Sequence, residues 1–249
     1  MSLKALLIVW LCAAPLAAAD LATYQRKAEM APKDPQAQFN LGVVAYQAGK
    51  LDIASDALAK AVKLQPKDAE AWELYGTVLS ARQDRPGALD ALRTVTKLDA
   101  KRANAWMRLG KLESDSEDPK ALAEAAEAYD RAGRLSEGDG RPWLNQGLLW
   151  ARLGKDDKAT TAFEKAVKLK GGAAAASGLC VLYNKNGDYK RALKACGDAA
   201  QGPGRAEDWY NLAFAQQRRQ KPDEARQALI RALIDSDKDA ETIVRRSLD

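Results

Sequence analysis

A motif that recurs about every 34 residues is the strongest constraint on how this chain folds. It consists of a tryptophan, two variable residues, a large residue and then glycine or alanine, and it begins at Trp72, Trp106, Trp143 and Trp209. Twelve residues beyond the small position comes alanine, also in two units that lack the tryptophan: Ala54, Ala88, Ala159, Ala192 and Ala225. A unit of this length cannot bury an apolar face alone, so the units must stack on one another.

Composition and turn residues indicate that each unit is helical. The chain of 249 residues contains 49 alanines, but only 21 isoleucines, valines and threonines together. Alanine favours helices and β-branched residues favour strands, which argues against a sheet. Glycines at Gly49, Gly154 and Gly187 lie between amphipathic segments, where glycine accepts the left-handed backbone that ends a helix. The sequence therefore predicts an all-α fold with two helices in each unit.

The repeated pattern resembles that of the tetratricopeptide repeat (TPR) family. On this pattern the repeats span residues 35–68, 69–102, 103–139, 140–172, 173–205 and 206–239. The resemblance implies a right-handed superhelical solenoid of helix pairs, with an N-terminal capping helix at 20–34 and a partial capping helix at 240–249. Small residues would let the second helix approach closely, and the repeated tryptophans would be core; the small residues are Gly42, Gly76, Gly110 and Gly147.

The third repeat is three residues longer than most of the others. We place the extra residues between its two helices, at 114–119. Asp118 suits the N-cap of the second helix and Pro119 suits its first turn. The acidic segment is expected to be a solvated turn.

The first residues have the pattern of a secretory signal peptide. A basic start through Lys4 precedes an apolar run at 5–16, and small residues then end at Ala19, before Asp20. We expect a signal peptide at 1–19, cleaved between Ala19 and Asp20, and a periplasmic mature protein without a transmembrane helix. A membrane anchor would need roughly 20 apolar residues. An outer-membrane lipoprotein modified at Cys12 is the alternative.

Charge and missing residue types exclude several function classes. Basic residues number 39 and acidic residues 34, and the two are interleaved along the chain, so no basic stripe is present for nucleic acid. The sequence has no histidine, which excludes Ser-His-Asp and Cys-His catalysis and the usual zinc sites. We expect no enzyme activity, no cofactor and no metal.

The resemblance implies that the first helices line a groove that holds partner segments. Apolar side chains with scattered asparagines dominate the corresponding positions, and the carboxylate clamp of chaperone-binding relatives is absent. The residues expected to contact a partner are Phe39, Asn40, Val43, Tyr46, Met107, Leu144, Asn145, Leu148, Val181, Tyr210, Asn211 and Phe214. Such a surface suits an extended or helical segment.

These features predict a non-enzymatic interaction scaffold of the bacterial cell envelope. Its partners would be protein or peptide segments of envelope proteins, within a machine such as those of type IV pili, gliding motility or outer-membrane biogenesis. A module that binds cell-wall material or a small ligand, and an assembly lipoprotein at the outer membrane, are the alternatives. The sequence carries no signal for an oligomeric state.

Two cysteines beyond the signal peptide fall in the fifth repeat. Cys180 takes the small position of the first helix, and Cys196 takes the position that holds Leu58, Leu92 and Phe163 elsewhere. In an antiparallel pair these positions face one another, and the periplasm is oxidising, so we expect a structural disulfide. Two buried thiols are the alternative.

Overall fold

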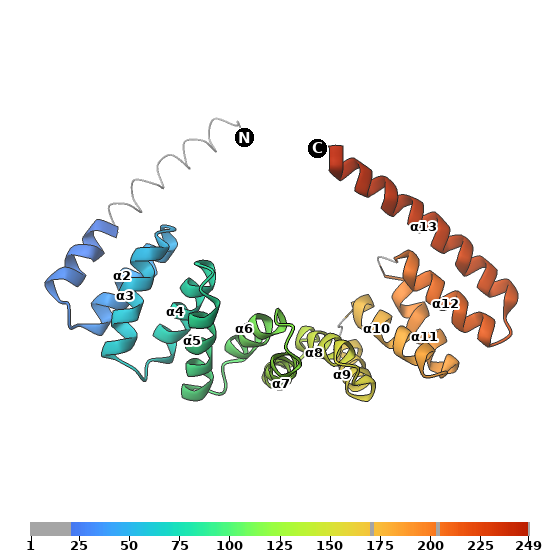
Figure 1. The fold of residues 1–249 in the computed structure, drawn as a ribbon, viewed down its shortest axis with the longest axis horizontal. Coiled ribbons are helices and arrows are strands. Elements are labelled where there is room, and N and C mark those ends of the chain that lie inside the picture. The colour runs from blue at the N-terminus through green and yellow to red at the C-terminus, as the bar shows by residue number, and fades with distance from the viewer. Residues whose placement is uncertain (1–20, 170–171, 203–204, 249) are drawn as a thin grey trace. The chain divides into compact units, whose positions relative to one another are not determined.

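The computed structural model describes residues 21–169, 172–202 and 205–248, and the regular structure of these residues is helical throughout (Figure 1). A helical segment at 21–30 precedes the pairs. The pairs, in chain order, are α2 (Pro35–Gln47) with α3 (Leu51–Leu64), α4 (Ala69–Ala81) with α5 (Arg85–Leu98), α6 (Ala103–Ser114) with α7 (Pro119–Leu135), α8 (Arg141–Arg152) with α9 (Asp156–Lys168), α10 (Gly172–Lys185) with α11 (Tyr189–Ala200), and α12 (Ala206–Arg218) with α13 (Pro222–Leu248). The predicted all-α fold of repeated helix pairs is confirmed. The expected signal peptide and its cleavage site lie outside the described residues.

The chain forms two compact units, one up to residue 112 and one from residue 113 onward. The boundary falls inside α6, so the third repeat contributes one helix to each unit. The first unit holds the 21–30 segment, α2–α5 and most of α6, and the second holds α7–α13.

The helical segment at 21–30 packs on the first pair. Leu21 and Ala28 belong to the same buried cluster as Leu41 and Leu58. The side-chain amide of Gln38, itself buried, donates to the carbonyl of Ala28 across 3.1 Å. The segment therefore covers the outer side of the first repeat with apolar contacts and a buried hydrogen bond.

Glycines, which have no side chain, allow the two helices of a pair to pack closely. A Cβ added to Gly42 would lie 2.5 Å from Leu58 Cγ, and one added to Gly147 would lie 2.5 Å from Phe163 Cδ1. Gly178, on the next first helix, would place a Cβ 2.7 Å from the same phenylalanine ring. Contacts this short do not occur, so the predicted packing role of Gly42 and Gly147 is confirmed.

Aspartates begin many of the helices. The carboxylate of Asp118 accepts from the backbone N–H of Lys120 at 3.0 Å, and Pro119 stands in the first turn of α7, as predicted. Asp34, Asp68, Asp84 and Asp188 cap α2, α4, α5 and α11 in the same way. Each carboxylate satisfies a backbone donor that would otherwise lack a partner.

The repeated tryptophans serve the fold. Trp143 is buried, with the ammonium of Lys165 4.1 Å from its ring centroid. Trp72 and Trp106 are half-buried, and their indole N–H groups donate to the carbonyls of Pro66 and Ala100, both at 2.9 Å. Each of these two hydrogen bonds ties a first helix to the turn that precedes it.

Two expected boundaries differ in the structure. The interhelix segment of the third repeat is only 115–118, and most of the extra length lies in α7, which has 17 residues where the other second helices up to α11 have 12 to 14. The expected division at residue 239 is absent, because α13 runs unbroken from Pro222 to Leu248. No glycine or proline follows Pro222 to end the helix.

The fifth repeat places its two cysteines against each other. The Sγ atoms of Cys180 and Cys196 lie 2.04 Å apart, the Cα atoms are 4.8 Å apart, and both residues are fully buried. This geometry is compatible with the expected disulfide.

Candidate partner-binding surface

The first unit presents a first-helix face that changes character from repeat to repeat. On α2, Phe39 and Tyr46 are half-buried and pack against the buried cluster of the first repeat, with Asn40 and Val43 also partly exposed. The next two first helices, α4 and α6, present charged and hydroxyl side chains instead, apart from the half-buried Met107.

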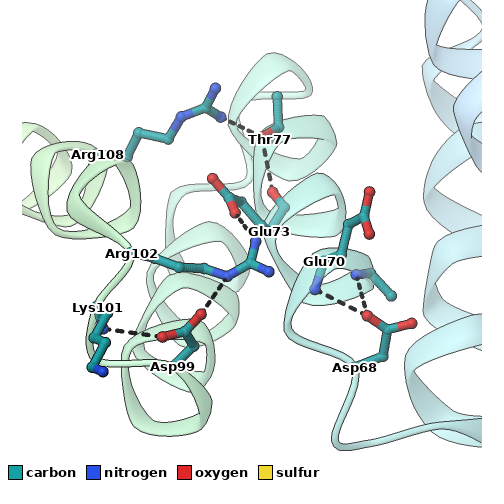
Figure 2. A network of polar contacts seen from close by, with 9 residues as sticks. Asp68, Glu70, Glu73, Thr77, Asp99, Lys101, Arg102 and Arg108 are labelled. Atoms are coloured by element: carbon teal, nitrogen blue, oxygen red, sulfur yellow. Dashed lines mark hydrogen bonds and ion pairs between the residues drawn. The ribbon is translucent and has the colours of Figure 1, made fainter.

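A polar network fixes these side chains of α4 and α6 (Figure 2). The guanidinium of Arg102 donates to Glu73 Oε2 at 2.6 Å and to Asp99 Oδ2 at 3.0 Å. The hydrogen bond that Arg102 donates to Glu73 is the main reason that the pKa of Arg102 is raised above its usual value. Arg108 donates to the hydroxyl of Thr77, which itself donates to the Glu73 carbonyl at 2.8 Å. The donors and acceptors of this face are thus used within the unit.

The second unit presents an apolar first-helix face. Leu148 on α8 and Val181 on α10 are 52% and 42% exposed, and Phe214 stands at the same register position of α12. The first unit has Val43, Thr77 and Lys111 at this position. Because α10 contacts both α8 and α12, the three apolar side chains belong to neighbouring helices. We call this the apolar row: Leu148, Val181 and Phe214.

Tyr210 lies beside Phe214 on α12 and extends the apolar row. Tyr210 is 59% exposed, and both rings line a pocket of about 320 Å³ that Pro222 and Leu229 of α13 complete. The ring of Phe214 meets that of Tyr189 edge-on at 6.1 Å, and the guanidinium of Arg218 lies 5.2 Å from its centroid. Phe214 is therefore held in place and half-exposed.

Hydrogen bonds between neighbouring first helices fix the apolar row from beneath. Asn184 of α10 donates to the backbone carbonyl of Asn211 at 3.0 Å. The hydroxyl of Ser177 donates to the buried carboxylate of Asp208 at 2.5 Å and accepts from Arg205 at 3.0 Å. These bonds join α10 to α12 and its preceding turn, so the register of the row is set by the fold.

Comparison with known proteins decides the family. The tetratricopeptide repeat model matches residues 14–68, 44–84 and 76–140, more than half of the chain, and a second model of that description matches 140–172. The chain belongs to the tetratricopeptide repeat family. TPR folds serve as protein-interaction scaffolds, and this chain has such a fold.

Solved TPR structures share the fold. A MamA crystal structure is 26% identical, covers 61% of this chain and 86% of its own, and has a TM-score of 0.54. YrrB, described as a TPR protein with an unusual peptide-binding site, is 21% identical over 72% and 92%, with a TM-score of 0.59. Pseudomonas aeruginosa pilF is 23% identical over 78% and 88%, with a TM-score of 0.55. No curated protein matches the sequence.

In this TPR protein none of the twelve residues expected to contact a partner is buried. Their role remains a prediction, but the structure divides them: Phe39 and Tyr46 pack on a core cluster, whereas Leu148, Val181 and Tyr210 are well exposed. Leu144 and Asn145, beside Leu148 on α8, are partly exposed.

The sequence did not reveal the apolar outer face of α13. Leu229 stands at the position of the buried Leu58 and Phe163, yet it is exposed, as are Ile230 and Leu233. Runs of apolar residues at helical spacing look alike in sequence whether or not another helix covers them, so the spacing alone did not distinguish this exposed face from a buried one.

A second groove of about 770 Å³ lies along α9, α10 and α11. Tyr183 in its wall donates to Glu164 Oε1 at 2.6 Å, and the guanidinium of Arg191 lies 4.5 Å from its ring centroid. Burial, followed by the hydrogen bond to Glu164, raises the pKa of Tyr183 to about 12.

We expect the Tyr183 phenol to titrate at a pKa of about 12, above the ordinary tyrosine value of 10. The pKa of Tyr183 in the folded protein exceeds the ordinary value of 10, so the contribution of the neutral phenol to the free energy of unfolding is complete below about pH 10. This contribution is lost as the pH rises toward 12. The chemical shift of 13Cζ-labelled tyrosine, assigned with Tyr183→Phe, measures this. Glu164→Gln should lower the pKa; an unchanged titration would contradict the role of Glu164.

Within the described ranges, no helix is both long and apolar enough to cross a membrane. The same residues contain no cluster of three or more potential metal ligands.

Proposed function

We propose that this TPR protein holds an extended or helical segment of a partner protein on the apolar row and its neighbours Leu144, Asn145, Tyr210 and Asn211. The supporting observation is that apolar side chains stand at one register position on three consecutive first helices of a single unit, with Leu148 and Val181 exposed and Phe214 partly exposed. Exposed apolar groups in a fixed row favour a partner that removes them from water.

The spacing of the apolar row defines the chemistry of the partner segment. Packed helices lie about 8–10 Å apart, so apolar side chains of the row repeat at about that interval. An extended chain advances about 3.3 Å per residue and a helix about 1.5 Å. A matching segment thus has an apolar side chain at about every third residue if extended, or every sixth or seventh if helical.

The polar network of the first unit argues for locating the partner segment on the second unit. Glu73, Arg102 and Arg108 already have partners, so a ligand there would have to replace existing ion pairs. Residues of the apolar row have exposed side chains that bind without breaking a charge pair. The expected contacts at Phe39, Asn40, Val43, Tyr46 and Met107 are secondary in this proposal.

We further propose that this scaffold acts in the cell envelope, in the periplasm, as part of a multiprotein machine. The basic start, apolar run and small residues before Asp20 support export. Sequencing the N-terminus of protein isolated from its host tests this assignment: a first residue of Asp20 supports it, and a lipid-modified Cys12 would place the protein at the outer membrane.

We expect Val181→Asp to abolish most partner capture, because a carboxylate in the row would have to be buried against apolar groups. A photoreactive amino acid at Leu148 or Val181, crosslinked in the host cell, identifies the captured protein by mass spectrometry. The fraction of that protein recovered with the Val181→Asp variant then measures the loss.

Val167→Asp is the matched control. Val167 on α9 is 37% exposed, against 42% for Val181, and lies on a second helix away from the row. The control should capture the partner normally. Equal losses in the two variants, or crosslinks from position 167 to the same protein, would contradict the assignment of the row.

A further inference from the structure

The pair of α12 and α13 carries an apolar surface that the described residues of its own unit leave exposed. Leu229, Ile230, Leu233 and Ile234 of α13 are between 43% and 67% exposed. Their spacing of one, four and five residues places them on one side of the helix. The opposite side, with Ala225 and Ala228, packs against Trp209 and Leu212 of α12. We call the exposed set the α13 stripe.

Two positions of the stripe differ in residue type from most other second helices. Ile234 stands where the first four repeats have basic, exposed side chains, Lys63, Lys97, Arg134 and Lys168, and where the fifth has Gln201. Ile230 stands where the second to fourth repeats have Arg93, Asp130 and Glu164, and where the first and fifth have Ala59 and Gly197. Two positions that are mostly polar or charged in other repeats are thus exposed and apolar here, which marks an interaction surface.

Leu229 and Leu233 continue the interface by which repeats stack. In earlier repeats most of the corresponding side chains are buried, such as Leu58 with Val62; the exception is Val167, at the position of Leu233, which is 37% exposed. The pair of α12 and α13 therefore ends in a face of the kind that binds another helix. A helix from a second molecule is the same kind of partner.

The arrangement of the stripe is self-complementary. The successive steps between Leu229, Ile230, Leu233 and Ile234 are one, three and one residues, and this order is the same from either end of the helix. Two α13 helices laid antiparallel therefore place Leu229 opposite Ile234 of the second copy, and Ile230 opposite its Leu233. Arg226, exposed at one end of the stripe, is then far from the Arg226 of the second copy, whereas a parallel pair would bring these like charges together.

The described residues at the other end of the repeat array present charged side chains. The helical segment at 21–30 buries Leu21 and Ala28 in the first repeat and exposes Arg26, Lys27 and Glu29 beside Met30, which is 81% exposed. Head-to-tail stacking, which would give open filaments, would have to bury these charged groups.

We propose that two copies of this chain associate through the α13 stripe, antiparallel and with two-fold symmetry. Because each copy offers the same patch to the other, assembly closes at the dimer. The two first-helix surfaces remain outside this contact except for Tyr210, which lies beside Leu229 in the pocket between α12 and α13. A dimer would therefore present two apolar rows to partner proteins.

Sedimentation equilibrium of the purified protein over a hundredfold concentration range tests the proposal. We expect a mass that rises to twice that of the chain and no further, and a Leu233→Asp variant that stays at the monomer mass throughout. Leu98→Asp is the control, since Leu98 is an exposed leucine at the end of α5, outside the stripe. It should dimerise like the unchanged protein.

A monomer mass for the unchanged protein at every concentration would overturn the proposal, and so would a dimer that survives Leu233→Asp. Growth beyond the dimer would overturn the closed, two-fold arrangement. Circular dichroism establishes that the variants are folded, and Ile234→Lys, which restores the basic residue of the other repeats, gives a second monomeric variant if Leu233→Asp unfolds. Partner capture by Val181→Asp is measured separately, so either idea can fail alone.

Discussion

Phe163→Ala is expected to lower the free energy of unfolding of the second unit by about 3–5 kcal/mol, the range for truncating a buried phenylalanine. The side chain is only 1% exposed and stands between two first helices, in contact range of Gly147 on α8 and Gly178 on α10. Removing the ring leaves a cavity that these helices cannot fill, because glycine has no side chain to move into it. Urea denaturation followed by circular dichroism measures the loss.

A loss of stability this large is expected only where the truncated side chain is buried, and Leu148→Ala is the control. Leu148 lies on α8 as Gly147 does, but it is 52% exposed, so its truncation should change the free energy of unfolding by well under 1 kcal/mol. A loss below about 1 kcal/mol for Phe163→Ala, or equal losses for both variants, would contradict the packing described here.

Local rules of sequence predicted the helix pairs well. The glycines that meet Leu58 and Phe163, and the cap of α7 at Asp118, depend on neighbours that the repeat register already specifies. A position that recurs has the same surroundings in most units, so the pattern carries three-dimensional information. The apolar character of Leu148 and Val181 was read from the same register.

Features that depend on neighbouring repeats were harder to predict. The apolar face is replaced by ion pairs such as that between Glu73 on α4 and Arg102 in the turn before α6, two residues that are 29 apart in sequence. The extra length of the third repeat went into α7 because its alanine-rich sequence continues the helix at little cost, whereas sequence counting placed it in the turn. Exposure of Leu229 depends on which helices lie beside α13, and the repeat position alone does not specify them.

The disulfide between Cys180 and Cys196 is expected to make a large contribution to the free energy of unfolding. The two residues join α10 to α11, are 16 apart in sequence, and have Cα atoms 4.8 Å apart. In the chain-entropy model, closing a loop of this size contributes about 3 kcal/mol by restricting the unfolded chain. Reduction should therefore lower the free energy of unfolding by about that amount.

Thiol counting on unfolded, unreduced protein is the direct measurement, and it should find neither cysteine free. Two free thiols would mean that the pair are buried small residues, the alternative that sequence allowed. Stability must then be compared in three forms: oxidised protein, reduced protein, and Cys180→Ala with Cys196→Ala. The double variant loses the cross-link together with some buried contacts, so it should be at least as unstable as the reduced form.

The position of this disulfide explains why its reduction should destabilise mainly the fifth repeat. Ala176 stands there in place of the tryptophan of the second, third, fourth and sixth repeats, so the repeat has less apolar surface to exclude from water. Both cysteines are fully buried beside Asn184, whose amide also holds the backbone of α12. Hydrogen exchange should therefore show reduction loosening α10 and α11 more than α8 and α9; uniform loosening of all four would contradict a local structural role for the bond.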